Sequence, residues 1–310
     1  MGTVPLDSGT RRTATSPSVV CTMNTLKSPL SIVTTVPTVT AEGTESDVIA
    51  DANDQPSAFD AMANDYDVTF TDTDLGRRFR AVVWRRLDEQ IVAGQRVLEL
   101  NCGTGADAVH LAERGVCVVA TDLSPAMVDA TTAKANELGV GHLVQARQLA
   151  IEDVGTLVDQ GPFSAIISDF GGMNCVADIG AIGADLAAPL ASGGTAFLCV
   201  MGPVVPWEWA WYLAHGQPLK AIRRLRRRAR WRGITIRYPS ASSVRRALSP
   251  WFEPVATTAI GALVPPPYAQ SWATRHGRFV DRLERWERRL ETRRVTVAMA
   301  DHYLLELRRR

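Results

Sequence analysis

The chain has few cysteines, no long apolar run and almost no net charge. Its five cysteines are widely spaced and include no CxxC pair, which argues against a disulfide framework or a zinc site. An odd, unpaired set fits a reducing compartment. No segment is apolar enough over the length of a membrane span, and the N-terminus lacks the pattern of a signal peptide. We therefore expect a cytoplasmic protein without a membrane span.

Overall charge is equally uninformative about partners. There are 34 basic and 33 acidic residues, and the formal net charge is +1, so nucleic acid and anionic membranes are not indicated by total charge. The hydrophobic fraction of 46% is typical of a globular protein with a sizeable core. One local exception is the stretch from Lys220 to Arg232, which holds eight bases and no acid.

The organisation changes near residue 57. Residues 1–56 are rich in Ser, Thr, Val and Pro, and we expect a disordered or poorly ordered extension there, with a swapped or edge β-segment as the alternative. Residues 57–310 then form the folded domain. Residues 57–95 predict two covering helices. The first carries one apolar face and the second runs from Leu75 to Ile91; the first face consists of Phe59, Met62, Ala63 and Tyr66.

From Arg96 the pattern alternates between apolar strands and helices. This alternation predicts an α/β fold with a parallel sheet and helices on both faces. The expected strands are residues 96–100, 116–121, 143–148, 163–168, 195–201, 252–263 and 301–307. The expected helices are residues 107–114, 124–138, 178–190, 240–248 and 278–293.

A glycine-rich turn joins the first of these strands to its helix. Gly103 and Gly105 follow the strand directly, and glycine there lets the backbone turn tightly and approach a ligand. The segment from Gly103 to Ala108 also satisfies the G-x-G-x-x-A pattern of dinucleotide sites. On its own this turn is compatible with NAD, with another nucleotide, or with no ligand.

An acid at the end of the second strand narrows the choice. Asp122 lies where a carboxylate can accept hydrogen bonds from both ribose hydroxyls, and Leu123 and Met127 place apolar side chains beside it for an adenine. The alternative is that Asp122 only favours the start of the next helix.

Together these segments resemble the class I S-adenosylmethionine (SAM)-dependent methyltransferases. Val97–Gly105 resembles the first motif of that family and Ala120–Met127 the second, while Phe59–Asp67 resembles the N-terminal helix that covers the cofactor in many bacterial members. The resemblance spans about residues 58–201. It implies a Rossmann-like, doubly wound, mostly parallel seven-stranded sheet with an N-terminal helical cover. Lid insertions would follow strands 5 and 6, at residues 203–239 and 263–298.

The resemblance also implies the residues of the cofactor site. Glu99 and the following loop would surround the methionine part of SAM, Asp122 would hold the ribose, and Leu123 would pack on adenine. Ala150 stands where many relatives have Asp, so backbone groups or Glu152 would contact the adenine, and Asn101 replaces a common Gly. The expected set is Tyr66, Glu99, Asn101, Cys102, Gly103, Gly105, Asp122, Leu123, Met127, Ala150, Ile151, Glu152 and Ser168.

Catalytic candidates lie beyond the carboxyl ends of the strands, where open parallel sheets bind ligands. Asp169 follows the fourth strand and is the first choice for a polar group near the methyl donor and acceptor. It could instead cap a helix or contact the donor's amino group, and many relatives have Asn there. Tyr66 on the covering helix and Tyr268 after three prolines are further candidates.

For the acceptor, the Trp-rich segment after Met201 could form a wall against a flat or cationic molecule, or simply pack against the core. The expected substrate contacts are Phe170, Asn174, Trp207, Trp209 and His215. We expect methyl transfer to carbon, nitrogen or oxygen of a small molecule, such as a heteroaromatic or other specialised metabolite, with release of S-adenosylhomocysteine (SAH). No metal is expected, because no His/carboxylate cluster has coordination spacing.

The basic stretch leaves alternatives open. Leu219, Ile222, Leu225 and Ala229 form a narrow apolar stripe, which predicts an amphipathic helix over Lys220–Arg232. Such a helix could be a solvated lid, contact an anionic substrate or RNA, or lie on a membrane surface. An RNA methyltransferase and a noncatalytic SAM-binding partner remain the alternative functions, although nucleic acid is not the expected partner. Monomer and homodimer are not distinguished.

Overall fold

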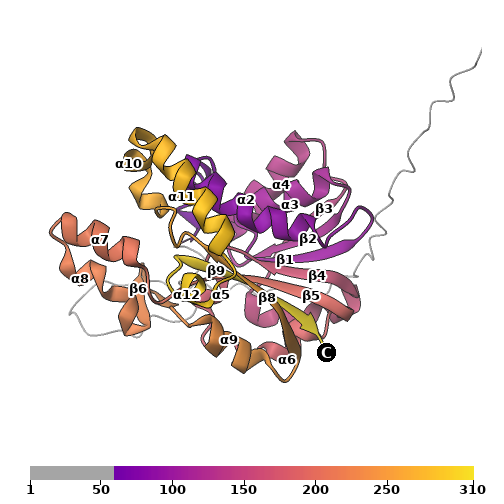
Figure 1. Cartoon of the computed structure of the whole chain (residues 1–310). Coiled ribbons are helices and arrows are strands. Elements are labelled where there is room, and N and C mark those ends of the chain that lie inside the picture. Colours follow the sequence, from indigo (N-terminus) through magenta and orange to yellow (C-terminus); the bar gives the residue numbers. More distant parts are fainter. Residues whose placement is uncertain (1–58) are drawn as a thin grey trace, which may run out of the picture.

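The computed structural model describes residues 59–310, so the extension expected at residues 1–56 lies outside the described part. A seven-stranded sheet runs through the centre in the order β3-β2-β1-β4-β5-β9-β8 (Figure 1). Strands β1 to β5 are parallel and β9 is antiparallel to both neighbours, which confirms the mostly parallel Rossmann-like sheet. The strands are β1 (Arg96–Leu100), β2 (Cys117–Asp122), β3 (Val144–Gln148), β4 (Phe163–Ser168), β5 (Leu190–Met201), β8 (Phe252–Ile260) and β9 (His302–Arg309).

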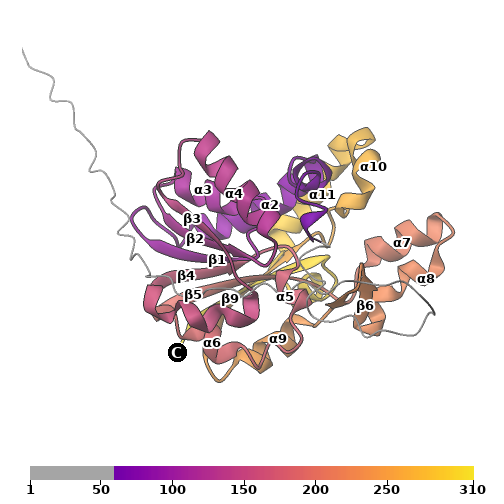
Figure 2. The ribbon, with the colours of Figure 1, turned by 180° about the vertical axis from the view of Figure 1, so that it is seen from behind.

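Helices cover both faces of this sheet (Figures 1 and 2). Because successive strand residues point to opposite faces, Val97 joins one apolar core and Leu98 the other. Strands covered on both sides are mostly apolar, and β1 and β4 bury Val97, Leu98, Leu100, Phe163, Ala165, Ile166 and Ile167. One face carries α2 (Asp74–Asp88), α3 (Ala106–Glu113) and α4 (Pro125–Glu137), and the other carries η3 (Ile151–Gln160), α5 (Gly172–Cys175), α6 (Gly183–Ala187) and α9 (Ala241–Leu248).

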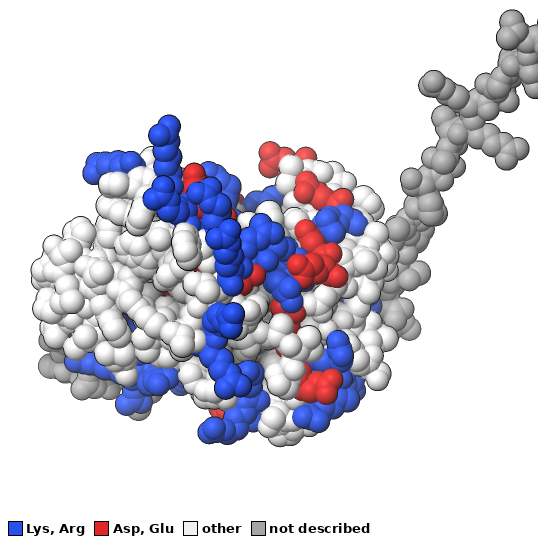
Figure 3. All heavy atoms as spheres, in the orientation of Figure 1, with Lys and Arg blue, Asp and Glu red and all other residues white. Residues whose placement is uncertain are grey.

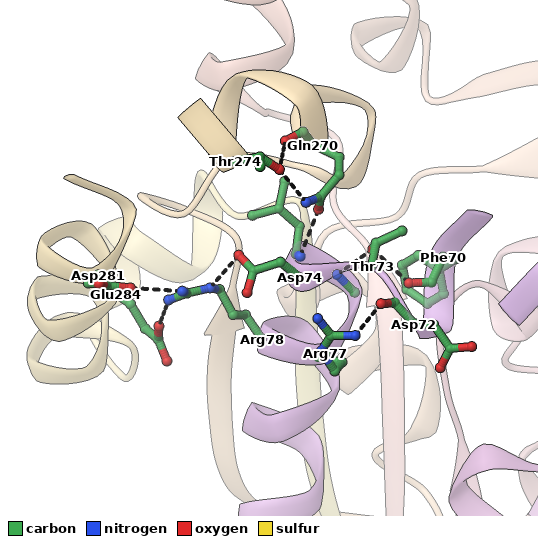
Figure 4. A network of polar contacts seen from close by, with 12 residues as sticks. Phe70, Asp72, Thr73, Asp74, Arg77, Arg78, Gln270, Thr274, Asp281 and Glu284 are labelled. Atoms are coloured by element: carbon green, nitrogen blue, oxygen red, sulfur yellow. Dashed lines mark hydrogen bonds and ion pairs between the residues drawn. The ribbon is translucent and has the colours of Figure 1, made fainter. Parts of the chain in front are cut away.

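The insertion between β8 and β9 braces helix α2. Arg78 of α2 bonds to Asp281 at 2.7 Å and also contacts Glu284, both on α11 (Figure 4). The backbone N–H of Leu75 donates to Gln270 Oε1 at 2.9 Å. These contacts fix the insertion to the N-terminal cover. It consists of η5 (Pro267–Ala269), α10 (Gln270–Arg275), α11 (Gly277–Leu290) and α12 (Arg294–Ala298).

The segment after β5 forms a separate lobe, which we call the lid, at the left of Figure 1. The lid begins where the chain leaves the sheet at Met201 and ends where the chain reaches α9. Two short helices, a single 3-10 turn and a two-stranded hairpin make up the lid: α7 (Pro206–Ala214), α8 (Pro218–Ala221), η4 (Arg223–Arg226), β6 (Arg228–Trp231) and β7 (Ile234–Arg237).

The prediction of a single amphipathic helix over Lys220–Arg232 is therefore wrong. Its second half is strand β6, which pairs antiparallel with β7. Burial alternates with period two along both strands, and the connecting Arg232 and Gly233 both have positive φ, +46° and +85°. Two central residues with positive φ make the tight turn whose twist matches a hairpin, and the Ile residues of β7 supply its buried face.

Two further helix predictions need correction. The helix expected at 178–190 is present only as α6 (Gly183–Ala187), which ends before Pro189, a residue that cannot continue a helix. The first covering segment forms irregular turns and a π-helical stretch, η2 (Asp67–Thr71), rather than one regular helix. Within residues 59–310, no helix combines the length and apolarity needed to cross a bilayer.

Candidate cofactor and acceptor site

A cavity of about 480 Å³ opens at the carboxyl ends of β1, β2 and β4. This size suits a cofactor-sized ligand, and the position is the usual ligand site of an open α/β sheet. The inner part of its wall comes from the strand ends and the N-terminal cover, and the outer part comes from the lid. Both parts belong to the same continuous space.

The loop after β1 contains three residues with positive φ, a backbone conformation that favours glycine. Gly103 and Gly105 have φ of +55° and +80°, and Asn101 has φ of +50°. Asn101 joins the loops after β1 and β4, since its Nδ2 donates to the Asp169 carbonyl at 2.6 Å and its Oδ1 accepts from Ser168 at 2.5 Å. The side chain that replaces a common glycine thus links two ligand-facing loops.

Asp122, at the end of β2, fixes the loop after β1 through hydrogen bonds to backbone N–H groups. Its carboxylate accepts the backbone N–H of Gly103 at 2.9 Å and of Ser124 at 2.9 Å. Burial raises its pKa, while these two N–H donors oppose that shift. Each carboxylate oxygen keeps a further lone pair, so Asp122 can also accept hydrogen bonds from a ribose.

Three acids and one cation gather at the deep end of the site. Glu99, Asp107 and Asp169 are buried, and the Arg80 guanidinium pairs with Asp107. Trp84 Nε1 also donates to Asp107 at 2.6 Å. Burial, and then the nearby Asp107 carboxylate, raise the pKa of both Glu99 and Asp169 well above the usual range. One cation for three acids makes this end of the site suited to a cationic ligand.

The buried polar groups that lack a hydrogen-bond partner match the methionine part of SAM. Among residues 59–310, Glu99 Oε2 and both Asp169 oxygens meet no donor in hydrogen-bond geometry, and Arg80 Nε meets no acceptor. A buried polar atom without a partner is costly, so a ligand that supplies the partner gains that energy. An ammonium and a sulfonium suit the acids, and a carboxylate suits Arg80. The residues present therefore fit SAM.

Tyr66 contributes a neutral phenol. Burial raises its pKa to about 12, with Arg80 opposing the shift. Near neutral pH the phenol keeps its proton, so Tyr66 can donate a hydrogen bond in the cavity but is a poor general base.

The part of the cavity where the sequence predicts the adenine is apolar. Leu123 and Met127 line it from the β2 side, and Leu149 to Ile151 line it from the β3 side. Glu152 also lines the cavity and is exposed, whereas Ala150 offers only its backbone and a methyl group. Both residues therefore lie at the cavity, and their contact with an adenine stays a prediction.

The outer half of the cavity takes its wall from the hairpin of the lid. Trp231, Ile236 and Tyr238 supply aromatic and branched side chains, and Arg223 and Arg230 supply positive charge. Phe170 also lines the cavity, 4.9 Å beneath the Arg80 guanidinium carbon. The outer half is thus a largely apolar slot with cationic edges.

Several predicted residues lie outside the cavity lining. Trp207 packs on Trp272 and donates to the Leu263 carbonyl, Trp209 is half-buried on α7, and His215 is exposed and stacks on Trp211. The aromatic wall comes instead from Trp231, because the chain folds back as a hairpin between α7 and α9.

Four more predicted residues support the lining from behind. Asn174 is fully buried and bonds to the backbone of Met201 and Arg237, so it ties β5 to the lid hairpin. Gly105 and Ser168 shape the loops, and Glu99 lies beneath them. Tyr268 packs against Trp211 and Tyr212 on the lid, away from the lining.

The second insertion also stays outside the site. Within the described chain, residues 263–298 contribute nothing to the cavity lining. They pack instead on α2 and on Trp207, as the contacts above show. No group of three or more His, Cys, Asp or Glu residues with the geometry of a metal site occurs among residues 59–310.

Arg80 and Asp107 are functional candidates that the sequence reading missed. A signal for Arg80 was present, because it lies on the same helical face as Val83, three residues away, and so points into the core. Asp107 opens the helix after the glycine turn, where a carboxylate is also an ordinary helix-start residue. Trp231 gave no signal, since its place depends on the hairpin.

Comparison with known proteins agrees with this geometry. Residues 97–194 match the family described as a methyltransferase domain. A demethylmenaquinone methyltransferase of Mycobacterium marinum is 31% identical over 153 residues, which are 48% of this chain and 60% of the relative. A tRNA 5-carboxymethoxyuridine methyltransferase of Escherichia coli is 31% identical over 121 residues, which are 36% of this chain and 46% of the relative. The chain therefore spans about half the length of the curated relatives it matches.

A solved structure shows the same fold. Geranyl diphosphate C-methyltransferase from Streptomyces coelicolor, solved with Mg²⁺, geranyl diphosphate and SAH, superposes with a TM-score of 0.50 at 17% identity. The match covers 76% of this chain and 80% of that one.

Fold and site together define a nucleotide-binding α/β domain of the methyltransferase type. Its segment at residues 97–194 matches a methyltransferase domain, and the whole domain has the fold of a solved SAM-dependent methyltransferase.

Proposed function

We propose that this chain transfers the methyl group of SAM to a small, flat, largely apolar molecule, such as a heteroaromatic or other specialised metabolite. The observation that carries this proposal is the two-part cavity. Its acidic inner half suits the cofactor, and its aromatic outer half, closed by Trp231 and Tyr238, suits a flat acceptor. Relatives named for menaquinone and magnesium-protoporphyrin substrates support a small conjugated acceptor.

The protein's contribution would be orientation and charge. SAM supplies an electrophilic methyl group on a cationic sulfonium. Asp169 would hold the positive end of the donor, with Glu99 adding negative charge from beneath the loops, and Arg80 would hold its carboxylate. The aromatic wall would fix the acceptor plane and exclude water. Holding two reactants in line contributes about 7–11 kcal/mol to lowering the barrier.

Asp169 is the candidate general base. Its side chain lines the cavity, and neither carboxylate oxygen accepts a hydrogen bond within residues 59–310, so an ionised Asp169 is free to accept a proton. It would accept a proton from a nitrogen or oxygen acceptor, while an electron-rich carbon acceptor needs less help before attack. Tyr66 keeps its proton and would instead orient the acceptor or the donor.

We place this activity in the cytoplasm. Cys102, Cys175 and Cys199 form no disulfide within the described chain, as expected of a protein in a reducing compartment.

The test is an unbiased search for the methylated product. The chain is incubated with methyl-labelled SAM and a metabolite extract, with purified RNA as a parallel acceptor. Label in a small aromatic compound, much reduced with Asp122→Asn when SAM is limiting, is the expected result. Label that enters RNA alone would overturn the proposed acceptor class, and no transfer to any acceptor despite SAM binding would indicate a noncatalytic partner.

A further inference from the structure

The lid carries an exposed apolar surface that nothing in the described chain covers. Leu213, Leu219, Ile222 and Leu225 have exposed fractions of 59%, 74%, 44% and 47%. Leu213 lies on α7, Leu219 on α8 and Leu225 on η4, and Ile222 joins α8 to η4; these elements contact one another in sequence order. Figure 3 shows the uncharged surface of this lobe at the left. Clustered large apolar side chains in water usually mark a binding surface.

Basic side chains accompany this apolar surface. Between Trp209 and Phe252 the chain has one Lys and ten Arg, which makes eleven bases, and no acid. Arg223 and Arg224 pair with the buried Glu208. Five others form no ion pair anywhere in residues 59–310, and all five are exposed: Arg226, Arg227, Arg228, Arg230 and Arg232. Figure 3 shows a band of basic side chains below the apolar lobe.

This combination distinguishes between possible anionic partners. A nucleic acid would use the arginines but would leave Leu213, Leu219 and Ile222 in water. A membrane with anionic headgroups uses both, because apolar side chains enter the acyl boundary while Arg and Lys bind headgroups. Half-buried Trp209 and Trp211 on α7 add the aromatic residues that favour such an interface.

We infer that the lid docks this protein on anionic lipid bilayers, with Leu213, Leu219, Ile222 and Leu225 inserted and the neighbouring arginines on the headgroups. The docking surface stands apart from methyl transfer and is testable without it. Arg230 lines both the cavity and a shallow groove between β6 and β7. A docked lid would therefore bring the bilayer close to the outer half of the cavity, so that an acceptor dissolved in the membrane could enter it. This second step rests on the proposed function.

The docking surface is tested by cosedimentation of the full chain with vesicles of phosphatidylcholine alone and of phosphatidylcholine with phosphatidylglycerol. We expect binding to the mixed vesicles and little to the neutral ones. The triple change Arg226→Gln, Arg227→Gln and Arg228→Gln should weaken binding about 100-fold. The triple change Leu219→Ser, Ile222→Ser and Leu225→Ser should weaken it at least about tenfold.

Matched controls use equivalent residues elsewhere. Arg282, Arg285 and Arg289 of α11 changed to Gln, and the exposed Val92, Leu138 and Val158 changed to Ser, should leave vesicle binding intact. All the substituted residues are exposed, and circular dichroism tests whether each variant folds.

Three outcomes would overturn the docking inference. The first is no binding of the wild-type chain to mixed vesicles. The second is loss of binding in the control variants to the same extent as in the lid variants. The third is the absence of vesicle binding together with either RNA binding through the lid arginines or self-association lost in the Leu219, Ile222 and Leu225 variant.

A membrane-dissolved acceptor has its own readout. With SAM turnover already established on a soluble acceptor, mixed vesicles carrying an extracted lipid fraction should yield a labelled lipid. Vesicle binding without a labelled lipid would support the docking inference and contradict a membrane-dissolved acceptor.

Discussion

Asp122 both stabilises the fold and lies at the cavity. Asp122 fixes the glycine loop through two backbone N–H groups while it faces the cavity. An amide in its place would present an NH₂ group to one of those donors. Its position at the cavity could be predicted from sequence because it depends on a local feature, the end of a strand.

Replacing Asp122 by Asn should weaken SAH binding by about 10- to 100-fold, because a hydrogen bond to a charged group contributes about 1.5–3 kcal/mol. Equilibrium dialysis with labelled SAH measures the effect. Asp153→Asn, at an exposed carboxylate of η3, is the control and should bind as the wild type does. Equal affinity of both variants would remove Asp122 from the cofactor site.

Binding should also be linked to protons. The pKa values of Glu99 and Asp169 are raised in the free protein, chiefly by burial. A cationic ammonium favours the ionised carboxylates, so it lowers these pKa values and binding releases protons. SAH affinity therefore rises with pH until both groups are ionised without the ligand.

Calorimetry in buffers of different ionisation enthalpy measures this release near neutral pH. Asp169→Asn should release fewer protons than the wild type. Heat of binding that is independent of the buffer would contradict the assigned charge pairing.

At the scale of elements, the lid is tied to the sheet by one buried ion network. Arg224 of η4 bonds to Glu208 of α7 at 2.6 Å and to Asp301, just before β9, at 2.7 Å. Although burial opposes its ionisation, Arg224 and then His302 hold the pKa of Asp301 below its usual range. Breaking a buried pair leaves an uncompensated charge, which costs about 3–5 kcal/mol.

We therefore expect Arg224→Met to loosen the lid. Hydrogen exchange should accelerate in α7, β6 and β7, while the amides of β1 and β4 keep their protection. Arg226→Met, at an exposed neighbour without an ion pair, is the control. Unchanged exchange in the lid of the Arg224 variant would show that the network does not anchor it.

Elements also mark where sequence reasoning failed. The stripe of Leu219, Ile222, Leu225 and Ala229 fits a helix, while Ala229, Trp231, Ile234 and Ile236 fit a hairpin. Local propensity does not decide between them; the turn at Gly233 and the burial of the Ile residues do. Single apolar runs are ambiguous in this way whenever both periods fit.

For the whole molecule, the sheet and the cofactor loops could be predicted from sequence because their signals are contiguous. Val97–Gly105 and Asp122 each combine a strand, its end and its loop in a few residues. The acceptor wall could not be predicted, since Trp231 and Tyr238 reach the cavity only through the fold of the lid. Arg80 likewise meets Asp107 across 27 positions of sequence.

The charge distribution belongs to this scale as well. Eleven bases without an acid between Trp209 and Phe252, in a chain of net charge +1, leave the remainder with a net charge of −10. The lid and the rest of the molecule thus have opposite sign. Such a separation orients a molecule at a charged surface, in keeping with the docking inference.

The most direct measurement of the central claim is a calorimetric titration of the full chain with SAH and, separately, with NAD. The glycine turn alone is compatible with both ligands, whereas the acid cluster and Arg80 favour only the first. We predict saturable binding of one SAH per chain and no heat of binding from NAD. Binding of NAD, or no binding of SAH, would contradict the assignment of this cavity.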